Sequence, residues 1–397
     1  EWHHAWPRLL PDENHFLYQT YVHNSLDRQL VTASLDSPES SVLLRNISQV
    51  TLAASDQLAY VRDGRLFTQR FDPGKGTLVG EPAFVADNIS YFYPSSRAEF
   101  DAANGVIVYR SDTSTGKLTM MDRKGTMRVI DDHGPFDDHG LNFSPDGKKA
   151  AVTVLDRATE LGDIWIYDLS RGVRDRFTNE PVLANSPVWS PDGRSIVYSI
   201  AGLGELPHLV RRALSGSARE ELMPLGTFQF PGSFSPDGSA LYFRGNPYVS
   251  ARVFRLDMRT RKQEPVLNSG VVERDPQVSP DGKWLAYSSD ATGTNEVYLQ
   301  NLTGGDIPRL RISTHGGDNP RWRGDSRELF FLSHQQAMMS VVPRVAGEWS
   351  EPNTTELFHA PADTVSFAVH PDGQSFLFVE GAPGAADAFF HVILGWR

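Results

Sequence analysis

The stretch "NFSPDGKKAAVTVLD", residues Asn142 to Asp156, contains a four-residue turn between two short apolar runs. Proline at the second turn position presets φ at about −65°, aspartate can hydrogen-bond nearby backbone, and glycine accepts a left-handed conformation. The flanking runs, "LNF" and "AAVTVL", are partly alternating, as half-buried strands are. The stretch therefore predicts a β-hairpin.

The same turn returns along the chain at intervals of about 45 residues. Further copies, some of them degenerate, are centred on Asp12, Asp56, Asn104, Asp192, Asp237, Asp281, Asp325 and Asp372. The copy "RWRGDSRELFFLS" at Asp325 keeps both apolar strands but scrambles the turn, and it fills an interval of twice the usual length. Nine repeats therefore fit in the chain.

Composition indicates a turn-rich globular protein and excludes several classes of site. The chain has 397 residues, 33 glycines, 26 prolines, a net charge of −11 and no cysteine. The acidic balance and the lack of a clustered Lys/Arg footprint argue against nucleic acid as a partner. Without cysteine there can be no disulfide, thiolate nucleophile or Cys-ligated zinc.

The chain contains no apolar run of about 18 residues, so the sequence predicts no direct insertion into a membrane. It begins at Glu1 rather than with methionine. We therefore expect a processed or trimmed piece, with any leader, anchor or upstream domain outside these residues.

The repeat period predicts an all-β fold, a β-propeller of four-stranded antiparallel blades. Each blade has two apolar faces that it cannot bury alone, and stacking the blades around an axis buries both. Nine blades in a single domain spanning residues 1–397 are expected, and eight is the alternative because the second and third repeats are weak. The expected repeats are 5–46, 47–89, 90–134, 135–181, 182–226, 227–270, 271–317, 318–363 and 364–397.

Recurrent aromatic residues on the second strands are expected to fill the layers between blades. They are Tyr60, Tyr109, Tyr198, Tyr242, Tyr287, Phe330 and Phe376. The last repeat has three candidate strands, ending in "FHVILGW", and lacks a fourth. Propellers commonly borrow a missing strand from the opposite terminus, but "EWHH" at the N-terminus is too short to be a convincing partner.

The repeats "IWIYDL…RFT" and "PVWSPDGRSIVYS" resemble the TolB-type β-propeller. The chain is also similar, over nearly its whole length, to the C-terminal propeller regions of bacterial receptor-like Ser/Thr kinases and membrane-anchored winged-helix regulators. Stretches that carry this similarity include "RDGRLFTQRFDP…VGEP" and "STHGGDNPRWRGDSRELFFLS". This resemblance implies a sensor or interaction module in a periplasmic or otherwise extracytoplasmic location. The resemblance is more specific for the fold than for the function, because one propeller architecture hosts many activities.

No catalytic motif was found in the sequence. A hydrolase would need a G-x-S-x-G elbow, and the kinase motifs of full-length relatives are also missing. We therefore expect a non-enzymatic protein that needs no cofactor.

The densest polar stretch is "DDHGPFDDHG", which precedes the first strand of the fourth repeat. In a propeller this connection reaches the central channel, so Asp137, Asp138 and His139 could hold a divalent cation such as calcium. The equivalent connections add Asn185, Arg274, Asp275, His315, Asp318, Asn319 and Asp363 as ligand-binding candidates at the channel mouth. The alternative is that these short polar residues only cap strands and fix loops.

The leading hypothesis is a propeller that binds a protein, peptide or small ligand at one face, as a sensor or interaction module of a bacterial signalling or envelope protein. The alternative is a metal-dependent carbohydrate-active enzyme, because oligogalacturonate lyases share the propeller fold. A third reading is an envelope scaffold of the TolB type.

Overall fold

The computed structural model describes most of the chain. All regular secondary structure in the described part is β-strand. The described residues are 2–22, 28–47, 49–87, 89, 91–92, 97–111, 116–156, 161–202, 205–223, 227–245, 251–267, 270–304, 309–345, 348–381 and 390–394. The prediction of an all-β fold built from antiparallel sheets is confirmed.

The repeated turn forms by the same set of bonds in successive copies. The Ser190 hydroxyl donates to Asp192 Oδ1 at 2.6 Å, and its oxygen accepts from the Ser195 amide at 2.9 Å. Gly193 has φ of 67°, where a side chain would be strained. Equivalent bonds join Ser144 to Asp146, Ser235 to Asp237 and Ser279 to Asp281. The turn therefore fixes the register between the first and second strands of each sheet.

Six sheets form a closed ring, which we call the ring. Its first five sheets follow chain order: β15 (Phe136–Phe143), β16 (Lys149–Asp156), β17 (Leu161–Asp168) and β18 (Val173–Arg176); β19 (Leu183–Trp189), β20 (Ser195–Ala201), β21 (His208–Ala213) and β22 (Arg219–Glu221); β23 (Gln229–Phe234), β24 (Ala240–Gly245), β25 (Arg252–Asp257) and β26 (Gln263–Pro265); β27 (Glu273–Val278), β28 (Trp284–Ser289), β29 (Glu296–Asn301) and β30 (Leu310–Arg311); β31 (Asp318–Trp322), β32 (Leu329–Leu332), β33 (Ala337–Val345) and β34 (Glu348–His359).

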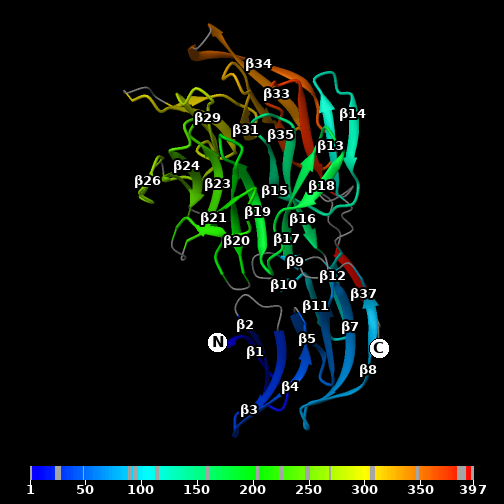
Figure 1. Cartoon of the computed structure of the whole chain (residues 1–397). Coiled ribbons are helices and arrows are strands. Elements are labelled where there is room, and N and C mark those ends of the chain that lie inside the picture. Colours follow the sequence, from blue (N-terminus) through cyan, green and yellow to red (C-terminus); the bar gives the residue numbers. More distant parts are fainter. Residues whose placement is uncertain are drawn as a thin grey trace.

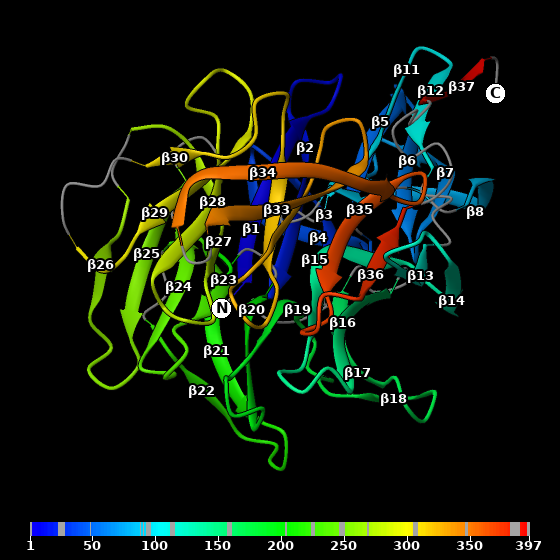
Figure 2. The same cartoon turned by 90° about the horizontal axis from the view of Figure 1, so that it is seen from above.

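The sixth ring sheet joins two distant parts of the chain. It contains β35 (Thr364–Val369) and β36 (Ser375–Glu380) together with β13 (Lys117–Asp122) and β14 (Met127–Asp131), as Figure 2 shows. β36 pairs with β13 from Lys117↔Glu380 to Asp122↔Ser375. Its inner strand β35 contacts β31 on one side and β15 on the other, so this sheet closes the ring.

Three further sheets lie outside the ring, and we call them the arc (Figure 1). The first is β1 (Trp2–Leu9), β2 (His15–Val22), β3 (Arg28–Ser34) and β4 (Ser37–Arg45); the second is β5 (Gln49–Ala54), β6 (Gln57–Arg62), β7 (Arg65–Asp72) and β8 (Thr77–Ala86); the third is β11 (Phe100–Ala103), β12 (Val106–Arg110) and the C-terminal β37 (Phe390–Leu394). A small two-stranded sheet of β9 (Tyr91–Phe92) and β10 (Arg97–Ala98) lies between the second and third in sequence.

The grouping into ring and arc corrects the expectation of a single nine-bladed ring. The sheets do not stack in one ring, because the six ring sheets already close on one another. The N-terminal strand β1 pairs with β2 and takes no part in closing the ring, as the shortness of "EWHH" indicated. Repeats 90–134 and 364–397 exchange strands instead: β13 and β14 complete the last repeat, and β37 completes the third. Nine blade-like sheets still match the nine repeats counted in the sequence.

The second-strand aromatics lie between sheets, as the repeat predicted. Tyr198 packs with residues of β16 and β17, and Phe330 packs with residues of β36. Tyr60, Tyr242, Tyr287 and Phe376 are likewise buried, while Tyr109 is partly buried against the second arc sheet. The apolar area removed from water between neighbouring sheets is thus the main favourable contribution to the fold.

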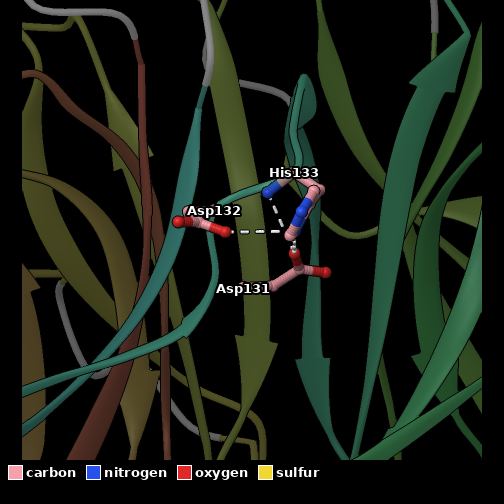
Figure 3. A group of neighbouring side chains, drawn as sticks. All are labelled: Asp131, Asp132 and His133. Atoms are coloured by element: carbon pink, nitrogen blue, oxygen red, sulfur yellow. Dashed lines mark hydrogen bonds and ion pairs between the residues drawn. The ribbon is translucent and has the colours of Figure 1, made fainter.

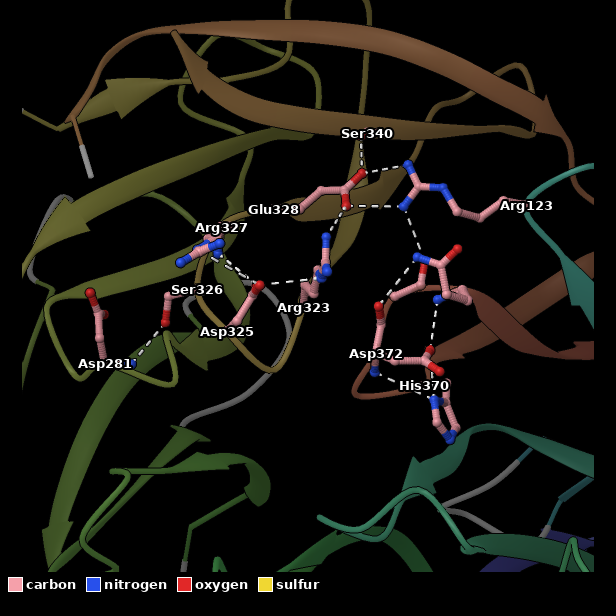
Figure 4. Close-up of polar contacts among 12 residues, drawn as sticks. Arg123, Asp281, Arg323, Asp325, Ser326, Arg327, Glu328, Ser340, His370 and Asp372 are labelled. Carbon is pink, nitrogen blue, oxygen red and sulfur yellow. Dashed lines mark hydrogen bonds and ion pairs between the residues drawn. The ribbon is translucent and has the colours of Figure 1, made fainter. Parts of the chain in front are cut away.

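A buried ion pair joins the exchanged strands to the rest of the ring (Figure 4). Arg123, which follows β13, donates to both Glu328 oxygens at 2.7 and 3.0 Å and to the Gly373 carbonyl at 3.0 Å. Glu328 is 5% exposed and also accepts from Ser340. The bond to Glu328 raises the pKa of Arg123. One guanidinium therefore links the fifth and sixth ring sheets.

We expect Arg123→Ala to destabilise the ring by about 3 kcal/mol, because it leaves the Glu328 carboxylate buried without its main partner. Arg211→Ala, which breaks an exposed pair with Glu220, should cost less than about 1 kcal/mol. Urea unfolding followed by tryptophan fluorescence measures both. Equal losses in the two variants would show that the closing pair has no special role.

The turn aspartates should make stability depend on pH. The bond from the Ser235 hydroxyl, with those from Ser239, lowers the pKa of Asp237 to about 2. A carboxyl with a depressed folded-state pKa stabilises the fold above its unfolded pKa of about 4, and this contribution is lost as pH falls toward 2. Asp237→Asn should therefore be less stable than wild type at pH 7, with a difference that shrinks below pH 4. Urea unfolding at pH 7, 4 and 3 tests this, with exposed Asp175→Asn as control; a constant difference would contradict it.

Candidate functional site

The inner strands β15, β19, β23, β27, β31 and β35 surround the centre of the ring. Each has a register shift against its second strand a few residues before the turn. At this bulge Ser186, Asp275 and Asn319 have positive φ, between 52° and 55°. Asn and Asp tolerate this conformation because their short side chains can hydrogen-bond locally. The sequence thus places polar residues at the same level on several inner strands.

A small cavity of about 50 Å³, partly open to solvent, occupies the centre of the ring. All six ring sheets contribute to its lining, for example through Asn142, Ser186, Gly232, Gln277, Arg321 and Ser366. A concave site with a few convergent polar groups is the usual place for a ligand in a propeller. We call it the channel cavity.

Arg321 on β31 is a charged residue of the channel cavity with unused hydrogen-bonding capacity. Its Nη1 donates to the Pro320 carbonyl at 2.9 Å, and the guanidinium lies 5.9 Å from the centre of the Phe367 ring. Its Nε is buried and has no hydrogen-bond partner among the described protein groups. Burial lowers the pKa of Arg321, and the negative charge of Asp275 offsets part of that effect. The cavity therefore holds a cation that the protein itself satisfies incompletely.

A second arginine, Arg244, also lines the cavity. It belongs to β24, is 6% exposed, and its guanidinium lies 4.5 Å from the centre of the Phe230 ring. Such a cation–π contact helps to orient the plane of the guanidinium. The cavity thus combines two arginines from different sheets.

Acidic groups lie beside these arginines on the fourth and fifth ring sheets. Asp318 Oδ2 is 3.1 Å from His334 Nε2. Burial raises the pKa of Asp318, and the neighbouring charge of Asp275 adds to the shift, while His334 and Arg274 oppose it. The Nε of Arg274 is buried without a hydrogen-bond partner among the described groups. This part of the ring therefore holds both acidic and basic side chains, and neither Asp318 nor Arg274 is fully compensated by its neighbours.

The structure brings together part of the predicted channel-mouth set. Asp275 and Asn319 line the channel cavity, and Arg274 and Asp318 lie next to them in the chain. Asn185 is buried on β19 beside Ser186. His315 is exposed in the loop before β31 and contacts Thr314.

Two predicted residues, Asp137 and Asp363, hold equivalent places, seven residues before the turn residues Ser144 and His370. Asp363 has a φ of 60°, and its carbonyl accepts from the Gly381 amide at 2.8 Å. The side chains of Asp138 and His139 lie outside the described residues. The predicted cation site at Asp137 to His139 therefore stays a prediction.

Sequence reasoning missed Arg244 and Arg321, although each left a signal. Arg321 is two residues before the turn position, where the other inner strands carry Asn142, Val188, Ser233, Gln277 and Ala368. Arg244 interrupts the buried apolar strand "ALYFRG". A charge in a strand with no exposed residue points to an interior site.

A different acidic group, Asp131, Asp132 and His133, brings three possible metal ligands within 4.8 Å (Figure 3). Asp131 already accepts from the Tyr167 hydroxyl at 2.6 Å and from Arg174, and it accepts from the His133 amide at 2.9 Å. These hydrogen bonds together with Arg174 lower the pKa of Asp131 despite its burial. The arrangement links the sixth ring sheet to the first, and the Asp131 carboxylate already has protein partners on both sheets.

Comparison with known proteins places this architecture. The family model described as "TolB beta propeller domain" matches residues 204–389. A solved structure described as TolB from Agrobacterium tumefaciens aligns with a TM-score of 0.56 and 18% identity, covering 68% of this chain and 99% of that one. At this identity the likeness concerns the fold alone.

Among curated proteins, an "Uncharacterized peptidase YuxL" of Bacillus subtilis is 25% identical over 219 residues, which cover 55% of this chain and 30% of that protein. A "Protein TolB homolog" of Chlorobaculum tepidum is 26% identical over 184 residues, 46% of this chain and 39% of that protein. The matched region thus spans well under half of either relative. No helix long and apolar enough to cross a bilayer occurs in the part of the chain that the structure describes.

The raised pKa of Asp318 predicts an unusual pH effect. Because the folded-state pKa of Asp318 is higher than its unfolded-state pKa, ionisation of this carboxyl lowers the free energy of unfolding. The loss begins above the unfolded-state pKa and is complete once the pH has risen through the folded-state pKa. Asp318→Asn, which can still accept from His334, should be more stable than wild type at pH 7 and lose that advantage toward pH 4. This sign is opposite to that of Asp237→Asn, and urea unfolding at both pH values measures it. A loss of stability at pH 7 would contradict the prediction.

Proposed function

Because the chain is a TolB-type β-propeller, we propose that it is a non-catalytic binding module that receives an acidic group of a peptide or protein in the channel cavity. The observation that carries this proposal is the buried Nε of Arg321, which has no partner among the described groups of the protein. A propeller of this type is a natural interaction module because its loops and channel are free to vary around a fixed frame.

The chemistry of the cavity favours a carboxylate. A guanidinium presents a planar fork of donors that matches a carboxylate, and such charge-assisted bonds are stronger than neutral ones. Arg321 and Arg244 approach the cavity from different ring sheets. Low dielectric in the cavity strengthens the attraction, and binding would give the buried Nε of Arg321 a hydrogen-bond partner.

A peptide or protein source suits the shape of the site. The cavity is open to solvent and is flanked by the bulged residues Ser186, Asp275 and Asn319, which offer polar groups around its rim. A chain terminus or an acidic side chain on an extended segment could enter such an opening, whereas a flat surface could not.

The wider role we propose is that of a sensor or interaction part of a bacterial signalling or envelope protein, acting outside the cytoplasm. The match to TolB-type propellers and the relative named as a TolB homolog support this role. The resemblance of the sequence to the propeller regions of receptor-like kinases supports the signalling context.

An enzymatic role has weaker support. The Bacillus subtilis relative is named as a peptidase, but the shared residues make up only 30% of it. This chain carries no G-x-S-x-G elbow. The metal-dependent carbohydrate-active alternative would require metal ligands at Asp137, Asp138 and His139.

Binding can be tested with a library of acetylated tetrapeptides that end in a free carboxylate. The tightest peptide is then compared with its C-terminal amide by calorimetry, and the amide should bind at least about tenfold more weakly. Arg321→Met and Arg244→Met should each weaken binding of the carboxylate peptide about tenfold or more, while Arg211→Met on the third strand β21, which does not line the cavity, should have no effect.

Circular dichroism of the Met variants controls for folding. Equal binding of acid and amide, or no binding of any peptide, would refute the proposal. Chelator-sensitive cleavage of a polysaccharide by wild type, lost in Asp137→Asn, would instead favour the enzyme alternative.

A further inference from the structure

One position at the end of the fourth strand distinguishes the sixth ring sheet from the other five. It lies opposite a third-strand residue that is fully buried in every ring sheet, namely Leu118, Ile164, Leu209, Val253, Val297 or Met338. In the first five sheets an apolar residue occupies this position, namely Phe177, Leu222, Val266, Ile312 or Phe358. In the sixth sheet the residue is Asp131, which pairs with Leu118. We call it the plug position.

The apolar residues at the plug position pack between neighbouring sheets. Phe177 contacts the ring of Tyr198 in the second sheet, and Leu222 belongs to one buried cluster with Leu241 and Phe243 of the third. Asp131 instead accepts hydrogen bonds from the Tyr167 hydroxyl and from Arg174 of the first sheet. The joint between the sixth and first sheets is therefore held by polar contacts at a position that is apolar in the other five joints.

A pocket of about 250 Å³ lies at this joint, on the outer side of the ring. β14 lines one side of it with Val129 and Ile130, and the hairpin of β17 and β18 lines the other with Leu169 and Val173. Val129 and Val173 are 50% and 45% exposed. Pockets for whole small molecules usually measure about 300–1,000 Å³, so this one suits one or two side chains of a larger partner. We call it the rim groove.

The rim groove carries a cation that has no acidic partner among the described residues. Arg128 lines the groove, and its Nη2 contacts Met120 Sδ at 3.7 Å. The carboxylates beside it are already engaged, because Asp131 accepts from Tyr167 and Asp168 accepts from the Ser170 hydroxyl. An acidic group that enters the groove therefore gains a guanidinium partner, whereas a basic group would meet a like charge.

The backbone around the rim groove favours an extended partner. β14 and β18 are the outermost strands of their sheets, so each has an outer edge that pairs with no strand of the described part of the chain. An extended peptide can add to such an edge through main-chain hydrogen bonds and place alternate side chains in a neighbouring pocket.

We propose that the rim groove binds an extended peptide segment of a partner protein that carries an acidic residue beside a large apolar one. The apolar side chain lies between Val129 and Val173, and the carboxylate pairs with Arg128. The ring itself shows this kind of fit, because at its five other joints an apolar side chain at the end of an extended strand packs between two sheets. Covering Val129 and Val173 also removes apolar surface from water.

The rim groove is separate from the channel cavity, since no described residue lines both. The proposal therefore goes beyond the carboxylate site at Arg321 and gives the propeller a second place to bind a protein. Failure at one site leaves the other standing.

The probe is a library of acetylated hexapeptide amides with Asp or Glu at the third position and Leu, Ile or Phe at the fourth. In calorimetry, Arg128→Met should bind the tightest peptide at least about tenfold more weakly than wild type, because a charge-assisted bond is lost. Arg259→Met, which changes an exposed arginine on a turn of the third ring sheet, is the matched control and should bind as wild type does.

A single thiol tests the apolar part of the groove, because the chain has no cysteine of its own. Val173→Cys should bind the peptide until N-ethylmaleimide modifies the thiol and fills the groove, and affinity should then fall at least about tenfold. Val79→Cys, at a valine of β8 that is 43% exposed, is the control and should bind equally well before and after alkylation. Circular dichroism of each alkylated protein shows whether it remains folded.

No library member that binds wild type, or an affinity unchanged both in Arg128→Met and in alkylated Val173→Cys, would overturn the proposal. Arg321→Met should leave the binding of these amides unchanged. If Arg321→Met abolished it while Arg128→Met did not, the peptide would belong to the channel cavity and the rim groove would be refuted. Free-carboxylate tetrapeptides that bind normally to Arg128→Met would keep the channel proposal independent of either result.

Discussion

The structure depends on one constraint: a four-stranded sheet with two apolar faces cannot remain alone in water. Every sheet of the ring buries one face against the sheet before it and the other against the sheet after it, through clusters that alternate along the second strand. Closing the circle satisfies all faces at once, which an open stack cannot do. The turn bonds between serine and aspartate act locally, by fixing which residues of each hairpin face which neighbour.

The exchange of strands between the third and last repeats gives the molecule its two-part plan. Because β13 and β14 complete the sheet of β35 and β36, the ring is closed by strands from both ends of its own sequence. Because β37 returns to β12, the C-terminal strand also anchors the arc (Figure 1). The ring therefore stays closed only while β13 remains paired with β36 in the sixth ring sheet. The ion pair of Arg123 and Glu328 stabilises the contact of this sheet with the fifth.

The same geometry creates the channel cavity. The six inner strands lie next to one another around the centre of the ring, and their bulges lie close together. Residues distant in sequence therefore meet around one axis. Polar residues at the bulge serve the backbone, since Asp275 and Asn319 accept a left-handed conformation, and at the same time line the opening. Arginines that reach the interior, Arg244 and Arg321, give that opening its chemical character. Frame and site are thus made by the same strands, and residue choice at a few positions distinguishes one propeller from another.

The amino-acid sequence by itself determined the units: the turn at Asp146, the strands on each side, the period, and the burial of aromatics such as Tyr198. These follow from contacts within about ten residues and from strand alternation, which are local properties. It also indicated Asp275 and Asn319 as residues of the channel, because their offset from the turn is fixed. Only the tertiary structure decided which strands complete which sheet, how many sheets close the ring, and that Arg321 and Arg244 point into one cavity. Those outcomes depend on pairings such as Lys117 with Glu380, and neither strand records its partner in its own pattern, because many apolar strands fit the same edge equally well.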